Sequence, residues 1–171
     1  ASPNAGNLRC SRCTRISVHV QQNTQQASLS FKKAVCMYIE YQDLALPVSK
    51  RFVDAITNLT KHQQADDSIT INFRDPNYSA ENGGFHPVEI RLEKHRDSWH
   101  FCYITDFTYV GIGPFAELAK DLDFDFQAGV FQNLHGLFPI EVALDIYQIW
   151  EGNFLHYWQV LNVFTIQISC D

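Results

Sequence analysis

The sequence contains no run of about 18 apolar residues, the length that a membrane-spanning helix requires. Its N-terminus also lacks the apolar stretch of about 7–15 residues that a secretory signal peptide carries. The five cysteines are odd in number and irregularly spaced, so they do not describe a disulfide framework. We therefore expect a cytoplasmic protein in a reducing compartment, with no membrane span.

Acidic residues are missing from the first 36 positions, which hold five Lys or Arg residues. The rest of the chain holds eight basic and all 19 acidic residues, a net charge of −11. Because an acidic surface repels phosphate groups, we expect no nucleic acid as a partner. A basic protein surface is the partner that this charge favours.

The uneven charge divides the chain into a polar, basic segment at 1–36 and a single acidic domain at 37–171. Met37 is the only methionine, so the preceding residues are a tag or a mis-annotated start, an ordered arm, or a targeting segment. Cys10 and Cys13 form a CxxC pair in this segment, but one such pair supplies only two of the four ligands that a structural zinc needs. We interpret this pair as chance and expect no metal or other cofactor.

The spacing of apolar residues indicates the elements of the domain. Helical spacing over 47–61 predicts a first helix, and a second is predicted from Pro139, with a possible break at Gly152. Two-residue alternation predicts strands at 68–74, 88–93, 99–110, 116–126 and 164–168. In the longest strand the alternation places Trp99, Phe101 and Tyr103 on one face and His100, Cys102 and Ile104 on the other.

Short links between these strands favour antiparallel pairing. The element order therefore predicts the α+β class, a twisted antiparallel sheet flanked by an N-terminal and a C-terminal helix.

Three alternating aspartates, Asp121, Asp123 and Asp125, are the sharpest local feature. On a strand their carboxylates would share one face at intervals of about 6.5–7 Å. Such a face could bind a basic partner or a cation, or it could be a solvated strand face that discourages aggregation. We name these three residues as candidate partner-binding residues.

The polar segment 75–86 is the second candidate, because loops of this length between strands often carry binding residues. It begins like a calcium loop, but Ala80 and His86 stand where that loop needs Gly and Glu, which excludes an EF-hand. A purely structural loop is the alternative. The candidate ligand-contacting residues of this loop are Asp75, Tyr78, Gly83, Gly84 and His86.

Catalytic motifs are missing as well: the sequence has no HExxH, no GxSxG and no phosphate-binding glycine loop. His86, His100 and Asp106 could converge across neighbouring strands to form an acid–base pair, although their spacing does not require it. No catalytic residue is therefore assigned.

Four segments together resemble a known bacterial family. They are INFRDPNYSAENGGFHPVEI (71–90), YITDFTYV (103–110), ELAKDLDFDF (117–126) and YQIWEGNF (147–154). Over Leu46 to Ile168 the chain is similar to a family of unknown function from vibrios and their relatives, found also on a pathogenicity island. Residues 1–36 match nothing in that family, which favours a natural start near Met37.

The resemblance implies a fold like that of the acidic mitochondrial matrix protein that also binds the globular heads of the first complement component. That protein is a trimeric ring of twisted antiparallel sheets flanked by helices. Its chain ends in a helix, whereas the alternation at 164–168 predicts a final strand here. The family has no assigned active site, so the resemblance implies no catalytic residue.

Two functional hypotheses follow. The first is a non-enzymatic, acidic protein-binding module that forms a homo-oligomer, such as a trimer, and binds a basic protein surface. The second is a small hydrolase or ligand-binding enzyme that uses the 75–86 loop with His86 and Asp106.

Overall fold

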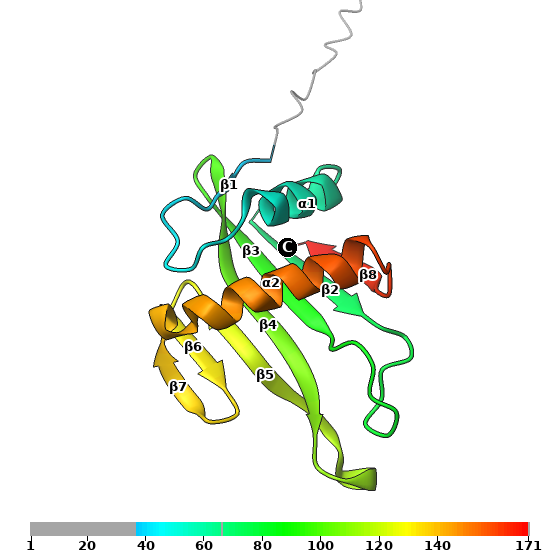
Figure 1. The fold of residues 1–171 in the computed structure, drawn as a ribbon. Helices are drawn as coiled ribbons and strands as arrows, with labels where there is room; N and C mark the ends of the chain where they lie inside the picture. The colour runs from blue at the N-terminus through cyan, green and yellow to red at the C-terminus, as the bar shows by residue number, and fades with distance from the viewer. Residues whose placement is uncertain (1–36, 66, 171) are drawn as a thin grey trace, which may run out of the picture. The chain divides into compact units, whose positions relative to one another are not determined.

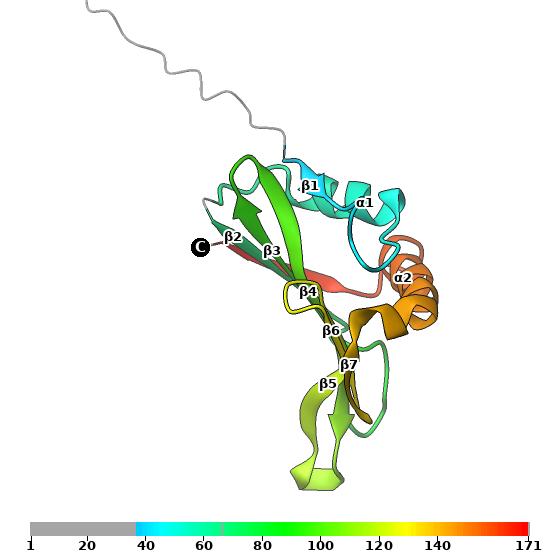
Figure 2. The same cartoon turned by 90° about the vertical axis from the view of Figure 1, so that its left-hand side faces the viewer.

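The structure is a computed structural model that describes residues 37–65 and 67–170. Cys10, Cys13 and the rest of the first segment lie outside the described residues, so the expectations for that segment stay predictions. Within the described part, one large sheet carries both helices on the same face (Figures 1 and 2). The α+β class, the largely antiparallel sheet and the two helices are thereby confirmed.

In the described residues the sheet has eight strands, of which seven follow the order β7-β6-β5-β4-β3-β2-β8 and the eighth, β1, lies off this path. The neighbours along this path pair antiparallel, whereas the short β1 pairs parallel with the start of β4, which the sequence did not predict. The strands are β1 (Ile39–Glu40), β2 (Ser68–Arg74), β3 (Val88–His95), β4 (Ser98–Val110), β5 (Glu117–Asp125), β6 (Val130–Asn133), β7 (Gly136–Pro139) and β8 (Thr165–Cys170).

The short β6–β7 hairpin was missed by the sequence analysis. β8 confirms the expected final strand and pairs with β2 at the edge of the sheet.

The first helix, α1 (Lys50–Thr60), begins three residues later than Pro47 because Ser49 caps it. The Ser49 hydroxyl accepts a hydrogen bond from the Phe52 backbone N–H at 3.1 Å. A 3-10 turn, η2 (Ile140–Ala143), leads into α2 (Leu144–Gln159), which passes through Gly152 without a break. The packing of α2 against the sheet outweighs the low helix propensity of Gly152.

Aromatic side chains fill the space between the helices and the sheet. Phe52 of α1 meets Phe101 of β4 at 5.9 Å between ring centroids and Phe154 of α2 at 6.0 Å. Buried Glu151 of α2 accepts hydrogen bonds from the Ser49 backbone N–H and from the Tyr147 hydroxyl, each at 3.0 Å. This carboxylate ties the start of α1 to α2 and fixes how the helices lie on the sheet.

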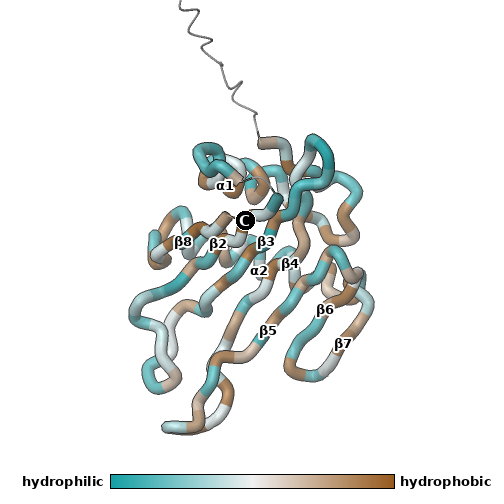
Figure 3. Tube along the Cα trace, turned by 180° about the vertical axis from the view of Figure 1, so that it is seen from behind, coloured by the Kyte–Doolittle hydropathy of each residue, from teal (hydrophilic) through white to brown (hydrophobic). Residues whose placement is uncertain are grey.

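Hydrophilic and hydrophobic residues alternate along the strands of the sheet (Figure 3). The face without helices carries polar side chains. On this face Tyr103 donates a hydrogen bond to Glu89 at 2.8 Å, and Arg91 donates to Thr70 at 3.1 Å. Within the described residues no helix is both long and apolar enough to span a membrane.

Two β-bulges change which side chains face the helices. In the β3–β4 pair, Arg91 lies opposite Tyr103 and Leu92 opposite Phe101, so Cys102 is an extra residue. Trp99 and Phe101 consequently share the covered face with Ile104 and Asp106. The sequence analysis placed Ile104 and Trp99 on different faces of this strand, and that prediction is therefore wrong.

Candidate functional site

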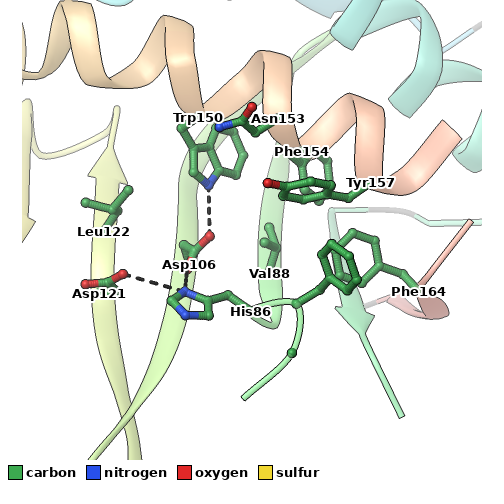
Figure 4. A pocket seen from close by; sticks show the side chains of 12 residues that line it. His86, Val88, Asp106, Asp121, Leu122, Trp150, Asn153, Phe154, Tyr157 and Phe164 are labelled. Atoms are coloured by element: carbon green, nitrogen blue, oxygen red, sulfur yellow. Dashed lines mark hydrogen bonds and ion pairs between the residues drawn. The ribbon is translucent and has the colours of Figure 1, made fainter. Parts of the chain in front are cut away.

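A cavity of about 370 Å³ opens between α2, the middle strands and the loop that precedes β3 (Figure 4). Its walls are largely aromatic, and its polar end is formed by one histidine and two aspartates. The lining residues are Gly84, Phe85, His86, Val88, Asp106, Asp121, Leu122, Trp150, Asn153, Phe154, Tyr157 and Phe164.

Asp106 of β4 is the anchor of the polar end and is only 8% exposed. One carboxylate oxygen, Oδ1, accepts a hydrogen bond from Nδ1 of His86 at 2.7 Å. The other, Oδ2, accepts one from Nε1 of Trp150 in α2 at 3.0 Å. A buried carboxylate is costly unless both oxygens are partnered, and here both are.

His86 is held in one orientation by this contact. Because an ionised carboxylate only accepts hydrogen bonds, Nδ1 of His86 carries the proton that is donated to Asp106. Asp121 of β5 also approaches this nitrogen, with Oδ2 at 3.6 Å from Nδ1. His86, Asp106 and Asp121, the acid cluster from here on, offer ligand atoms that all lie within 4.8 Å of one another.

The second β-bulge explains why Asp121 joins this cluster. In the β4–β5 pair, Asp106 lies opposite Leu122 and Phe107 opposite Lys120, which leaves Asp121 as the extra residue. A bulge re-aims the side chain of the inserted residue. Asp121 and its neighbour Leu122 therefore both line the cavity, although plain alternation would send them to opposite faces.

The electrostatics of the acid cluster follow from its one histidine and two carboxylates. The hydrogen bond to Asp106 raises the pKa of His86, and the charges of Asp106 and Asp121 add to this effect against the opposing effect of burial. Burial raises the pKa of Asp121, and the charge of Asp106 raises it further. The Asp106 carboxylate thus favours the protonated form of His86, which is the hydrogen-bond donor in this contact.

The loop before β3 is built to present Phe85 and His86. The Asp75 carboxylate accepts hydrogen bonds from the backbone N–H of Asn77 at 2.9 Å and of Phe85 at 3.1 Å. The Tyr78 hydroxyl lies 3.4 Å from Oγ1 of Thr108 on β4, and the Tyr78 ring lies 5.4 Å from that of His86.

Two glycines complete this loop. Gly83 and Gly84 both have positive φ, 66° and 134°, a region that favours glycine. The conformation of the loop thus depends on Asp75, Tyr78 and Gly83, while Gly84 and His86 line the cavity.

The three alternating aspartates do not share one face. Asp121 faces the cavity, whereas Asp123 is 5% exposed on the other side of the sheet. There it accepts hydrogen bonds from Thr105 at 2.5 Å and from Lys120 at 2.6 Å. Asp125 accepts one from the backbone of Ala128 in the turn after β5. Asp123 is thus neutralised locally, and the common acidic face expected from alternation does not form.

Of the suggested acid–base residues, the structure brings His86 and Asp106 together but not His100. The His100 ring hydrogen-bonds to Ser98 at 2.9 Å, near the start of β4. The sequence analysis missed Trp150 as a site residue, because the helical spacing predicts only that its ring is buried. It placed Asp121 on the wrong face because a bulge leaves the alternation of residue types unchanged.

Comparison with known proteins identifies the family. A model of a protein family of unknown function, DUF2787, matches residues 47–169. This span covers most of the chain. The chain belongs to this family. No curated protein matches it significantly.

Two solved structures are similar to this DUF2787 chain over nearly their whole length. The hypothetical protein VC0508 from the VSP-II pathogenicity island of Vibrio cholerae is 34% identical, with a TM-score of 0.72 over 79% of this chain and 99% of that one. VC1805 from pathogenicity island VPI-2 of Vibrio cholerae is 44% identical, with a TM-score of 0.68 over 76% of this chain and 100% of that one. VC1805 is described as sharing structural homology with the human P32 protein.

The DUF2787 match encloses the whole cavity, since the lining residues run from Gly84 to Phe164. The family and its fold are thereby shown, and the expected resemblance is confirmed. Because the family has no described activity, the function has to be argued from the site.

Proposed function

We propose that this DUF2787 protein binds a small molecule in the aromatic cavity. One observation carries the proposal: the acid cluster closes one end of a cavity that aromatic rings otherwise line. A volume of about 370 Å³ falls within the usual range of ligand sites, and a few convergent polar groups in an apolar pocket are their usual composition.

The charges of the lining residues select the class of ligand. The cavity holds two carboxylates and one histidine, and no lining residue is Lys or Arg. A group that donates hydrogen bonds or carries positive charge would be attracted to Asp121, whose side chain is 30% exposed. Aromatic rings attract cations and apolar groups. We infer a ligand with an aromatic or apolar body and a cationic end.

The residues that line the cavity favour ligand binding without a catalysed reaction. None of the residues lining the described cavity is Ser, Thr, Cys or Lys, which are common nucleophiles in covalent catalysis. Nδ1 of His86 donates its proton to Asp106, so this nitrogen is not free to accept a proton as a general base. The hydrolase alternative therefore has less support than the ligand-binding one.

Titration of the full chain with aromatic amines such as benzylamine, observed by NMR, tests the proposal. Aromatic acids with the same ring, such as benzoate, are the matched probes. We expect the amines to bind and the acids to fail, because only the amines suit the carboxylates. Asn153 lies exposed at the cavity, so Asn153→Trp should block it and weaken amine binding at least about tenfold.

His156→Trp is the matched control, because His156 is an exposed α2 residue that does not line the cavity. Equal amine binding by the two variants would contradict the proposal, as would the failure of all amines to bind the unaltered chain.

A second proposal, a homo-oligomeric protein-binding module, is favoured by a different observation. Ile112 and Phe115, at the tip of the β4–β5 hairpin, are 88% and 84% exposed. The hairpin projects beyond the sheet at its lower end in Figure 1. Large apolar side chains in such a position are typical of contact surfaces. The resemblance of VC1805 to human P32 and the acidic domain also support a protein partner, with a basic surface, and an oligomer such as a trimer.

Light scattering on the full chain tests this second proposal. We expect an oligomer that Ile112→Ser with Phe115→Ser dissociates, because both side chains would lose their apolar contacts. The double change Leu134→Ser and Leu137→Ser, at the exposed β6–β7 turn, is the control and should leave the mass unchanged. A monomeric unaltered chain would overturn the oligomer.

A further inference from the structure

The acid cluster has the composition and spacing of a metal site. It provides one imidazole nitrogen and two carboxylate oxygens from three separate segments: the loop before β3, β4 and β5. Ligand atoms around a tetrahedral zinc lie about 3.3–3.4 Å apart, as bonds of about 2.0–2.1 Å require. Nδ1 of His86 lies 2.7 Å from Asp106 and 3.6 Å from Asp121, so small shifts would bring both separations to this value.

The hydrogen bond that Trp150 donates to the cluster also suits a metal site. Trp150 donates to Oδ2 of Asp106, which leaves Oδ1 directed at Nδ1 of His86. Carboxylates that bind metals are commonly oriented by such a second hydrogen bond, and its loss weakens metal binding. Asp106 is thus fixed as a ligand that offers a single oxygen.

The charge of the cluster leaves room for a cation. Two carboxylates face one histidine and no other lining residue is basic, so the cluster carries net negative charge whether or not the histidine is protonated. A divalent ion bound to the two carboxylates and to a neutral imidazole would bring the net charge to zero. The cavity on the open side provides space for a fourth ligand, either water or a bound molecule.

We propose that His86, Asp106 and Asp121 bind a divalent transition metal ion, of which zinc is the test case. Mixed nitrogen and oxygen ligands suit zinc, manganese or iron, whereas calcium and magnesium prefer oxygen ligands alone. In the binding step Nδ1 of His86 and one oxygen from each aspartate bond to the ion, and the Nδ1 proton passes to solvent. The inference goes beyond the proposed function: an ion and the cationic end of a ligand would compete for Asp121, so each can bind when the other is absent.

Calorimetric titration of the full chain with zinc chloride tests the inference. Cys10 and Cys13 could bind zinc themselves, so every protein tested carries Cys10→Ser and Cys13→Ser. We expect one zinc ion per chain at the cluster and no comparable binding of magnesium. Asp121→Asn should weaken that binding at least about tenfold, since it removes a direct ligand. Thermal melting without zinc checks that the variant folds.

Asp125→Asn is the matched control: it lies on the same strand outside the cluster, and its amide oxygen can still accept the hydrogen bond from Ala128. It should bind zinc as the background protein does. The inference is overturned if the background protein binds no zinc, or if Asp121→Asn and Asp125→Asn bind it equally.

Amine titration in the presence of EDTA separates this inference from the proposed function. Amine binding without zinc binding would leave the proposed function standing and remove the metal site. Zinc binding that depends on Asp121, with no amine binding, would support the metal site and remove the proposed ligand class.

Discussion

Asp106 is the residue on which the site depends, because it joins the loop, the sheet and α2 through one carboxylate. The sequence places Asp106 within a strand and suggests His86 and His100 as residues that could converge with it. It cannot show that the partners are Trp150, 44 positions away, and His86, 20 positions away. Such contacts depend on how the helix crosses the sheet, which local periodicity does not encode.

Removing the indole donor of Trp150 should destabilise the fold. In Trp150→Phe the ring still fills the core, but Oδ2 of Asp106 loses its hydrogen bond, which costs about 1–3 kcal/mol for a buried acceptor. Trp158→Phe is the control, since it makes the same replacement at another α2 tryptophan, which packs against Phe73. Urea denaturation measures both changes in the free energy of unfolding. Equal losses would show that the Asp106 contact contributes nothing.

At the scale of elements, the five longer strands and both helices could be predicted, but not which side chains share a face of the sheet. Alternation located β4 and β5, yet one extra residue in each, Cys102 and Asp121, shifts the faces without changing the order of residue types. The β6–β7 hairpin was missed because its strands have only four residues each, too few for a clear period. The site lies where the second shift occurs, so its composition was not predictable.

The loop before β3 offers a test at this scale. A Cβ on Gly84 would lie 3.0 Å from Oδ2 of Asp75 and 3.1 Å from the Tyr78 Cα, at a φ of 134°. Gly84→Ala should therefore cost about 1–3 kcal/mol and displace Phe85 and His86, which weakens amine binding. Thermal melting and NMR titration measure the two effects.

Gly83→Ala is the matched control, since its φ of 66° lies in the left-handed region but its Cβ would meet nothing within 4 Å. It should cost about 1–2 kcal/mol and leave amine binding intact. If Gly84→Ala bound amines as tightly as Gly83→Ala, the loop would not control the position of His86.

For the whole molecule, the structure supports a binding site formed by a cavity more than one formed by a negatively charged surface. The sequence suggested a sheet with an acidic side, but Asp121 turns to the helix-covered side and Asp123 is paired with Lys120. Both helices lie on one face, so the cavity forms where α2 crosses the middle strands (Figures 1 and 4). Composition could not predict this cavity, because the cavity depends on which face of the sheet the two helices cover.

The most direct measurement of the central claim, that the cavity is the binding site, follows the three tryptophan indole N–H signals during an amine titration. Trp150 lines the cavity, whereas Trp99 lies at the start of β4 beside β1. We predict that the signal of Trp150, assigned by its loss in Trp150→Phe, shifts in proportion to bound amine while that of Trp99 stays in place. A bound amine that leaves the Trp150 signal unmoved would contradict the account.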